Sequence, residues 1–238
     1  DPCPRRVHTR GYKTAFIQTE LTVNKHGWFD PQARIVALEQ DVKDIIDPDT
    51  RTRMPEPLFF RANSGDCIEF KSSNFVPNAL ALDDSQVYTP TDTIGQHIPL
   101  VKFDVTSSDG SGNGWNYEDG TFSPEEVQER VFAINKARTA VGDPQRLRLK
   151  SHPLFAATCA PGDTLCQNLA DKGRCPPNAH LMDRHELHKK HPLCGAQRTV
   201  QRWYADPVRD NQGNDRTLRT VFTHDHYGPS THQQAGLY

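Results

Sequence analysis

The order of apolar and polar residues along the chain predicts several short β-strands. Five runs either combine β-branched with aromatic residues or alternate apolar with polar residues, as half-buried strands do. They are residues 12–23, 33–38, 67–71, 197–205 and 218–223. Turn-forming residues bound them, for example Asn24 and Gly27 after the first run, and residues 210–215 between the last two. The pattern therefore predicts a mainly β protein.

One helix is also predicted. Ser123 and Glu126 have the spacing of a capping box, and Pro124 occupies the first helical position. Apolar residues then recur at helical spacing, so a helix should continue to about residue 137; they are Val127, Val131 and Ile134. We expect this helix to belong to an insertion that packs on the β core.

Composition and charge exclude two classes of partner. The net charge of −2, from 28 basic and 30 acidic residues, gives no electrostatic footprint for nucleic acid. No apolar run approaches the roughly 20 residues that span a bilayer, so no membrane segment is expected. With 15 glycines and 18 prolines the chain is rich in loops. It begins at Asp1 without a methionine and is expected to be a fragment of a longer protein.

The cysteines indicate an oxidising compartment. Four of the six lie in one stretch rich in proline and glycine and lack the paired Cys-x-x-Cys spacing of a zinc site: Cys159, Cys166, Cys175 and Cys194. They are expected to form two disulfides, of undetermined connectivity. Cys67 lies in a predicted strand, where it can be a buried free thiol. A periplasmic, secreted or cell-surface location follows.

The last strand run leads to His224 and His226. Residues two apart on a strand share a face, so both imidazoles should point the same way, while Asp225 should point away from them as a surface group or a support for a ligand. Imidazole binds copper, zinc, iron and nickel. A pair of solvated or otherwise satisfied histidines has the same spacing.

A second group of histidines favours a solvated loop. Its members are separated by five, three and three residues among charged neighbours, and only the middle two could share a helix face: His180, His185, His188 and His191.

Two segments resemble the copper-binding segments of multicopper oxidases, and in particular their large bacterial branch, which is related to manganese-oxidising and ceruloplasmin-like enzymes. Residues 223–238, with His-x-His followed by Gly-Leu, resemble the second segment. Residues 95–104 follow a Gly-Asp turn and a strand and resemble the first segment. His97 matches its first histidine, but Pro99 stands where the second is expected, and proline cannot bind a metal.

The resemblance implies a fold and a chemistry. The fold is a cupredoxin-like Greek-key β-sandwich over residues 1–238, with a helical, disulfide-bearing insertion at about residues 107–195. The chemistry is copper-dependent oxidation of a phenol or a metal ion, such as manganese(II) or a cuprous ion, coupled to reduction of dioxygen. His97, His224 and His226 would be ligands in part of a trinuclear copper site. The catalytic residues stay unknown.

The same resemblance implies that the chain is incomplete as an oxidase. The family uses eight histidines in four segments and a His-Cys-His string, whereas no cysteine here is flanked by histidines. Further cupredoxin domains, in the same polypeptide or another subunit, would have to complete the site. With Pro99 in place we expect sub-stoichiometric copper binding and no turnover, and Pro99→His in an extended chain should restore both.

Two other classes of function are considered. A non-catalytic copper-binding or structural cupredoxin domain would also account for Pro99. A zinc hydrolase of the metallo-β-lactamase type also uses His-x-His, but there an Asp-His pair is expected where Gly228 and Pro229 stand.

Overall fold

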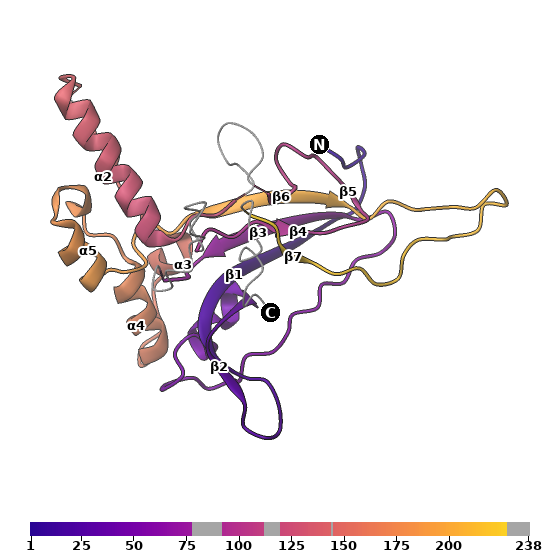
Figure 1. The fold of residues 1–238 in the computed structure, drawn as a ribbon, viewed down its shortest axis with the longest axis horizontal. Coiled ribbons are helices and arrows are strands. Elements are labelled where there is room, and N and C mark those ends of the chain that lie inside the picture. The colour runs from indigo at the N-terminus through magenta and orange to yellow at the C-terminus, as the bar shows by residue number, and fades with distance from the viewer. Residues whose placement is uncertain (78–91, 112–119, 144, 228–238) are drawn as a thin grey trace, which may run out of the picture.

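A curled sheet of five strands forms the centre of the molecule (Figure 1). The computed structural model describes residues 1–77, 92–111, 120–143 and 145–227. Within them the strand order is β2-β1-β3-β6-β5, and a separate two-stranded ladder pairs β4 with β7. Neighbouring strands are antiparallel except for β1 and β3, which run parallel. The strands are β1 (Thr9–Thr22), β2 (Phe29–Leu38), β3 (Cys67–Asn74), β4 (Gln96–His97), β5 (Lys102–Phe103), β6 (Arg198–Tyr204) and β7 (His224–Asp225).

Helices gather at one end of this sheet (Figure 1). The longest, α2, begins where the sequence predicts, because the hydroxyl of Ser123 accepts a hydrogen bond from the backbone N–H of Glu126. The helices are η1 (Glu39–Asp41), α1 (Val42–Ile45), α2 (Pro124–Ala140), α3 (Pro153–Ala156), α4 (Thr164–Gly173), η2 (Ala179–Leu181) and α5 (Arg184–Lys190). None of the helices in the described ranges has both the length and the apolar character that crossing a bilayer requires.

The described chain is therefore a mixed α/β structure built on a β-rich centre. Four of the five predicted strand runs are confirmed as β1, β2, β3 and β6. The prediction for residues 218–223 is wrong, since only His224–Asp225 form a strand there, and that strand pairs with β4. On the side of β6 away from β3, β5 pairs with Trp203 and Tyr204, and Oγ of Ser108 accepts from the N–H of Arg202, so the returning chain does not pair along that edge.

Three disulfides tie the chain. Cys159–Cys166 and Cys175–Cys194 lie in the helical region and confirm the two predicted bonds. The expectation of a free thiol at Cys67 is wrong, because Cys67 is bonded to Cys3. The parallel register explains this bond: Thr9 of β1 pairs with Cys67, so the residues before β1 run past the start of β3.

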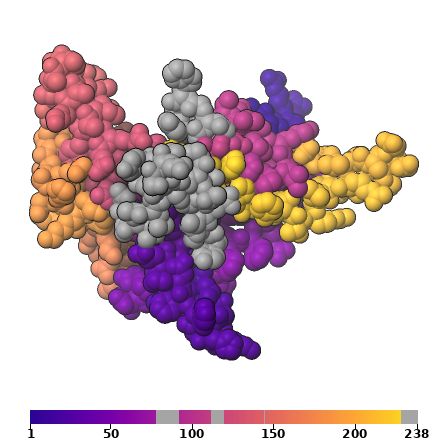
Figure 2. Space-filling view, viewed as in Figure 1, coloured from indigo at the N-terminus to yellow at the C-terminus, as the bar shows by residue number. Residues whose placement is uncertain are grey.

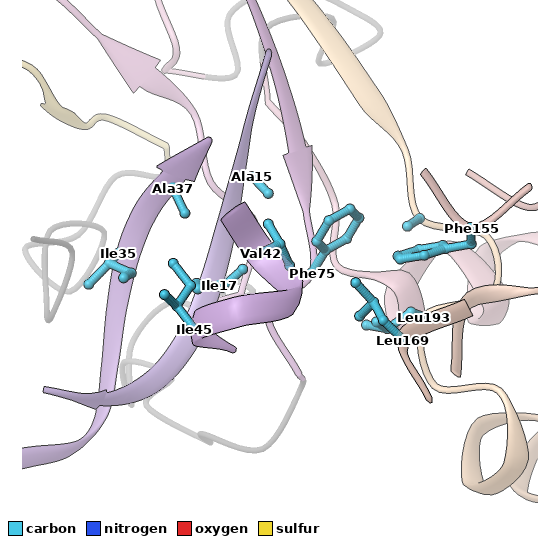
Figure 3. Packing of buried hydrophobic residues seen from close by; sticks show 11 residues of the cluster. Ala15, Ile17, Ile35, Ala37, Val42, Ile45, Phe75, Phe155, Leu169 and Leu193 are labelled. Atoms are coloured by element: carbon cyan, nitrogen blue, oxygen red, sulfur yellow. The ribbon is translucent and has the colours of Figure 1, made fainter. Parts of the chain in front are cut away.

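Both faces of the sheet are buried. On one face, β1 and β2 pack against α1 and against the helical region in the core cluster of Figure 3. The members of this helix-side core are Ala15, Ile17, Ile35, Ala37, Val42, Ile45, Phe75, Phe155, Leu169, Leu193 and Ala196.

The opposite face carries a second cluster, which we call the site-side core. It is centred on Phe70 and Trp203, whose rings stack at 4.7 Å between centroids. Ile94 and Ile98, on either side of β4, belong to this core, and Val221 packs against it just before β7. Apolar burial therefore fixes the β4–β7 ladder against the main sheet. Figure 2 shows the chain after β6 (yellow) reaching the surface beside the residues that precede β5.

A candidate metal centre of three histidines

The β4–β7 ladder brings together residues that are far apart in the sequence. His97 pairs with His224, and Gln96 pairs with Asp225. Two further hydrogen bonds fix the ladder: the N–H of Gly95 donates to Oδ1 of Asp225 at 3.0 Å, and the N–H of His226 donates to the carbonyl of Gly95 at 2.8 Å.

The ladder is also bonded to the main sheet. The side-chain amide of Gln201, on β6, donates to the carbonyl oxygen of Gln96 at 2.7 Å. Both glutamines are almost completely buried. Buried hydrogen bonds of this kind contribute about 1 kcal/mol each and set the position of β4 relative to β6.

The three imidazoles predicted to bind metal meet above this ladder. Their ring centroids are 4.5 Å apart for His97 and His226, 5.2 Å for His97 and His224, and 5.3 Å for His224 and His226. The ring of Phe103 on β5 contacts His97 edge-on at 5.2 Å and closes one side of the cluster. We call these three histidines the histidine cluster.

Hydrogen bonds fix which nitrogen of each ring is available. Nδ1 of His97 lies 2.7 Å from the carbonyl oxygen of Asp109, and Nδ1 of His224 lies 2.8 Å from the carbonyl oxygen of Asp225. A carbonyl only accepts, so both Nδ1 atoms carry the proton and both Nε2 atoms keep their lone pair. Donation from the second nitrogen to a backbone carbonyl is the usual support of a histidine that binds metal.

His226 completes the cluster differently. Its Nδ1 is buried and has no hydrogen-bond partner among the described residues, and its Nε2 lies 3.7 Å from Oδ2 of Asp109. Partial burial lowers the pKa of His226, and the neighbouring rings of His97 and His224 lower it further, against the opposing charge of Asp109. The neutral form that metal binding requires is thereby favoured.

Asp109 is a residue of this site that the sequence analysis did not find. Donor atoms of His97, Asp109 and His226 all lie within 4.8 Å of one another. The loop carrying Asp109 is held on β6, because Oγ of Ser108 accepts from the N–H of Arg202 at 3.0 Å and the carbonyl of Ser108 accepts from Nε1 of Trp203 at 3.2 Å.

Two glycines give the only sequence signal for this contact. A Cβ atom on Gly95 would collide with the backbone of Gly110, and one on Gly110 (φ +85°) would collide with the backbone of Gln96. The loop can approach β4 closely only because neither residue has a side chain.

Asp225 points away from the rings, as predicted, but it is buried. Only 3% of it is exposed, and burial raises the pKa of this carboxyl to about 8 against the hydrogen bonds from Gly95 and Tyr227. It holds β7 on β4 from beneath the histidine cluster.

Pro99 lies outside the strand. β4 ends at His97, Pro99 is in the following turn, and Leu100 has a positive φ of 69°. Residues 97 and 99 therefore do not share one face of a regular strand, which was the geometry expected for two ligands in this segment. Gly228 and Pro229, which bear on the zinc-hydrolase alternative, lie outside the described residues.

The second histidine group does not converge on a common point. Nε2 of His188 lies 3.4 Å from Glu125, Nδ1 of His191 donates to the carbonyl of Asp171, and His185 is exposed on α5. Among the described residues, the group around His97 and His226 is the one set of three or more ligating side chains close enough to share an ion.

The residues present can hold a metal ion. Two imidazoles have an available Nε2, a third has a buried nitrogen without a partner, and one carboxylate stands beside them. The sequence matches no family model and no curated protein. The geometry of these four side chains is therefore the basis for the candidate site.

Proposed function

We propose that this chain binds copper through His97, His224 and His226 and supplies part of the trinuclear copper site of a dioxygen-reducing oxidoreductase. The observation that carries the proposal is the convergence of three imidazoles, two of them oriented by backbone carbonyls. The β-rich centre would be part of a cupredoxin-like Greek-key sandwich, and further cupredoxin domains of the same polypeptide or another subunit would complete the site.

Each side chain has a defined part in this proposal. Donor atoms of His97 and His226 already lie within 4.8 Å of one another, and the ring centroid of His224 is 5.2 and 5.3 Å from theirs, so little ordering is needed when the ion enters. Phe103 shields one side of His97 from water, and Asp225 holds the two strands in register. Copper, when bound, would pass electrons from a reducing substrate, a phenol or a metal ion, to dioxygen.

The alternative is a copper-binding or structural cupredoxin domain without catalysis. Three histidines are fewer than a trinuclear site needs, and Pro99 adds none. The oxidoreductase hypothesis predicts that the chain consumes oxygen once the further domains are added, and the non-catalytic hypothesis predicts that it does not. The three disulfides suit an oxidising compartment, so we propose a periplasmic, secreted or cell-surface location for either.

Copper binding by single variants tests the proposal. Isothermal titration with Cu(II) should give a defined site in the wild-type chain, and its electron paramagnetic resonance spectrum should show nitrogen coupling. His97→Ala, His224→Ala and His226→Ala should each weaken binding by more than about tenfold to a hundredfold, the range already seen when only a supporting residue is lost. His185→Ala, on the exposed face of α5, is the matched control. Equal binding by all five proteins would refute the site.

A further inference from the structure

The main chain and the side chain of Asp109 do different things at the histidine cluster. The backbone carbonyl orients the ring of His97 by accepting from its Nδ1 at 2.7 Å. Any residue at this position would supply that carbonyl. The carboxylate of Asp109 is thus not needed to hold His97 in place, and its own position requires a separate explanation.

The carboxylate is directed at the rings. Oδ1 lies 3.4 Å from Nδ1 of His97, and Oδ2 lies 3.7 Å from Nε2 of His226. The hydroxyl of Ser111 donates to Oδ2 and so limits the rotation of the group. The side chain of Asp109 is only 12% exposed, so its carboxylate lies within the site and not in bulk solvent.

We propose that the carboxylate of Asp109 binds the ion together with His97 and His226 and that it makes the site selective for divalent ions over cuprous copper. This inference rests on the proposed metal site. Two imidazoles with one carboxylate form a set that divalent transition ions accept readily, whereas Cu(I) is selected by softer ligands. A carboxylate adds a full negative charge near the ion and attracts a dication more strongly than a monocation.

The same residue accounts for the altered first segment. Pro99 provides no donor and lies in the turn at residues 99–100, after β4 has ended. Asp109 approaches from the next loop, through the contact between Gly95 and Gly110, and brings its carboxylate within 4.8 Å of donor atoms of His97 and His226. The ligand set is then imidazole and carboxylate rather than imidazole alone.

The test compares the affinities of matched variants of the full chain for divalent ions and for Cu(I). Affinities for Cu(II) and Zn(II) are measured by titration against a competing chelator, and affinity for Cu(I) is measured without oxygen against a cuprous indicator. Asp109→Asn keeps the shape and the backbone carbonyl but removes the charge. Asp109→Glu restores the charge on a longer side chain. Asp104→Asn removes a carboxylate from the same stretch, where Asp104 accepts hydrogen bonds from Thr106.

The expected result is a selective loss. Asp109→Asn should bind Cu(II) and Zn(II) at least about tenfold more weakly, with less than about threefold change for Cu(I). Asp109→Glu should recover part of the divalent affinity, and Asp104→Asn should match the wild type. Circular dichroism confirms that each variant is folded.

Three results would overturn the inference, and they are distinguishable from failure of the metal site itself. Equal losses for Cu(II) and Cu(I) in Asp109→Asn would mean that Asp109 only supports the fold of the loop. Unchanged divalent affinity in that variant, together with loss in His226→Ala, would remove Asp109 from the ligand set but leave the histidine site standing. Absence of binding by the wild-type chain would end both proposals.

Discussion

The chain contains two kinds of histidine environment, and they differ in how far the imidazole nitrogens are satisfied. His152 is 2% exposed and has hydrogen-bond partners at both nitrogens. The histidine cluster is partly exposed, with the side chains of His97 and His226 at 14% and 36%. Nε2 of His97 and of His224 has no hydrogen-bond partner among the described residues.

His152 belongs to a closed network between the sheet and the helical region. Its Nδ1 accepts from the N–H of Leu154 at 3.2 Å and caps α3, so its Nε2 must carry the proton that it donates to Oγ of Ser73 at 2.9 Å. Ser73 in turn donates to Glu39 at 2.8 Å, and Arg198 makes a bidentate pair with the same carboxylate. Every proton in this chain of bonds has an acceptor.

The difference separates a structural histidine from a candidate ligand. A satisfied, buried imidazole stabilises the fold and has no lone pair left to bind an ion. Rings whose centroids lie 4.5 to 5.3 Å apart and whose nitrogens are incompletely hydrogen-bonded contribute little to folding and are suited to bind a cation. Mutation of His152 should therefore lower stability and leave metal binding unchanged, whereas mutation of the histidine cluster should weaken metal binding and change stability little.

The largest expected effect on stability is at His152. His152→Ala leaves a cavity beside Phe75 and Phe155 and removes the cap of α3, so it should lower the free energy of unfolding by about 3 kcal/mol or more. His226→Ala should change it by less than about 1 kcal/mol without metal. Urea denaturation followed by circular dichroism measures both. Equal losses would mean that the two environments do not differ as described.

The pH dependence of stability should also separate the two environments. Burial, helped by the charge of Arg198 and opposed by Glu39, lowers the pKa of His152 to about 4 from its usual value of 6.5. Between these values the unfolded chain binds the proton that the folded chain excludes, so stability is present above pH 6.5 and is lost as the pH falls toward 4. The loss should amount to up to about 3 kcal/mol.

Denaturation curves at pH 7, 5.5 and 4.5 measure this loss. His152→Ala should remove that part of the slope, and His226→Ala, which lacks a histidine of the cluster but keeps the buried network, should retain it. A slope that is unchanged in His152→Ala would show that other groups cause the acid sensitivity.

Metal ions should stabilise the protein through the histidine cluster alone. An ion that binds only the folded chain adds about 2.7 kcal/mol at a hundredfold excess over its dissociation constant. Thermal melts with and without Cu(II) should show this gain in the wild type and in Ser73→Ala but not in His97→Ala. A gain that survives in His97→Ala would locate the ion elsewhere.

The smallest effects come from two serines that donate to carboxylates. Ser73→Ala breaks the bonds to Glu39 and His152 inside the sheet and should cost about 1–2 kcal/mol. Ser111 is itself partly exposed, so Ser111→Ala, which removes its bond to Asp109, should cost less than about 0.5 kcal/mol. Chemical denaturation of both variants measures the difference, and a larger loss at Ser111 would contradict the comparison.

Sequence patterns determined the local elements of this protein. β-Branched and alternating residues located β1, β2, β3 and β6, and the Ser123 cap with its following proline located the start of α2. Cysteine clustering located the two disulfides of the helical region. The sequence also identified three of the side chains that meet at the candidate site: His224 and His226 by their spacing, and His97 in the other segment. His97 was assigned through the resemblance of residues 95–104 to a copper-binding segment, whereas the other features follow from short-range periodicity and local chemistry.

The tertiary structure alone decided how those elements combine. The parallel pairing of β1 with β3 set the bond between Cys3 and Cys67, and the crossing of β7 to β4 depended on β6 being flanked on both sides. Asp109 reached the histidine cluster through the close approach of Gly95 and Gly110. Contacts between residues so far apart depend on packing and sheet order, which leave no periodic pattern in the amino-acid sequence.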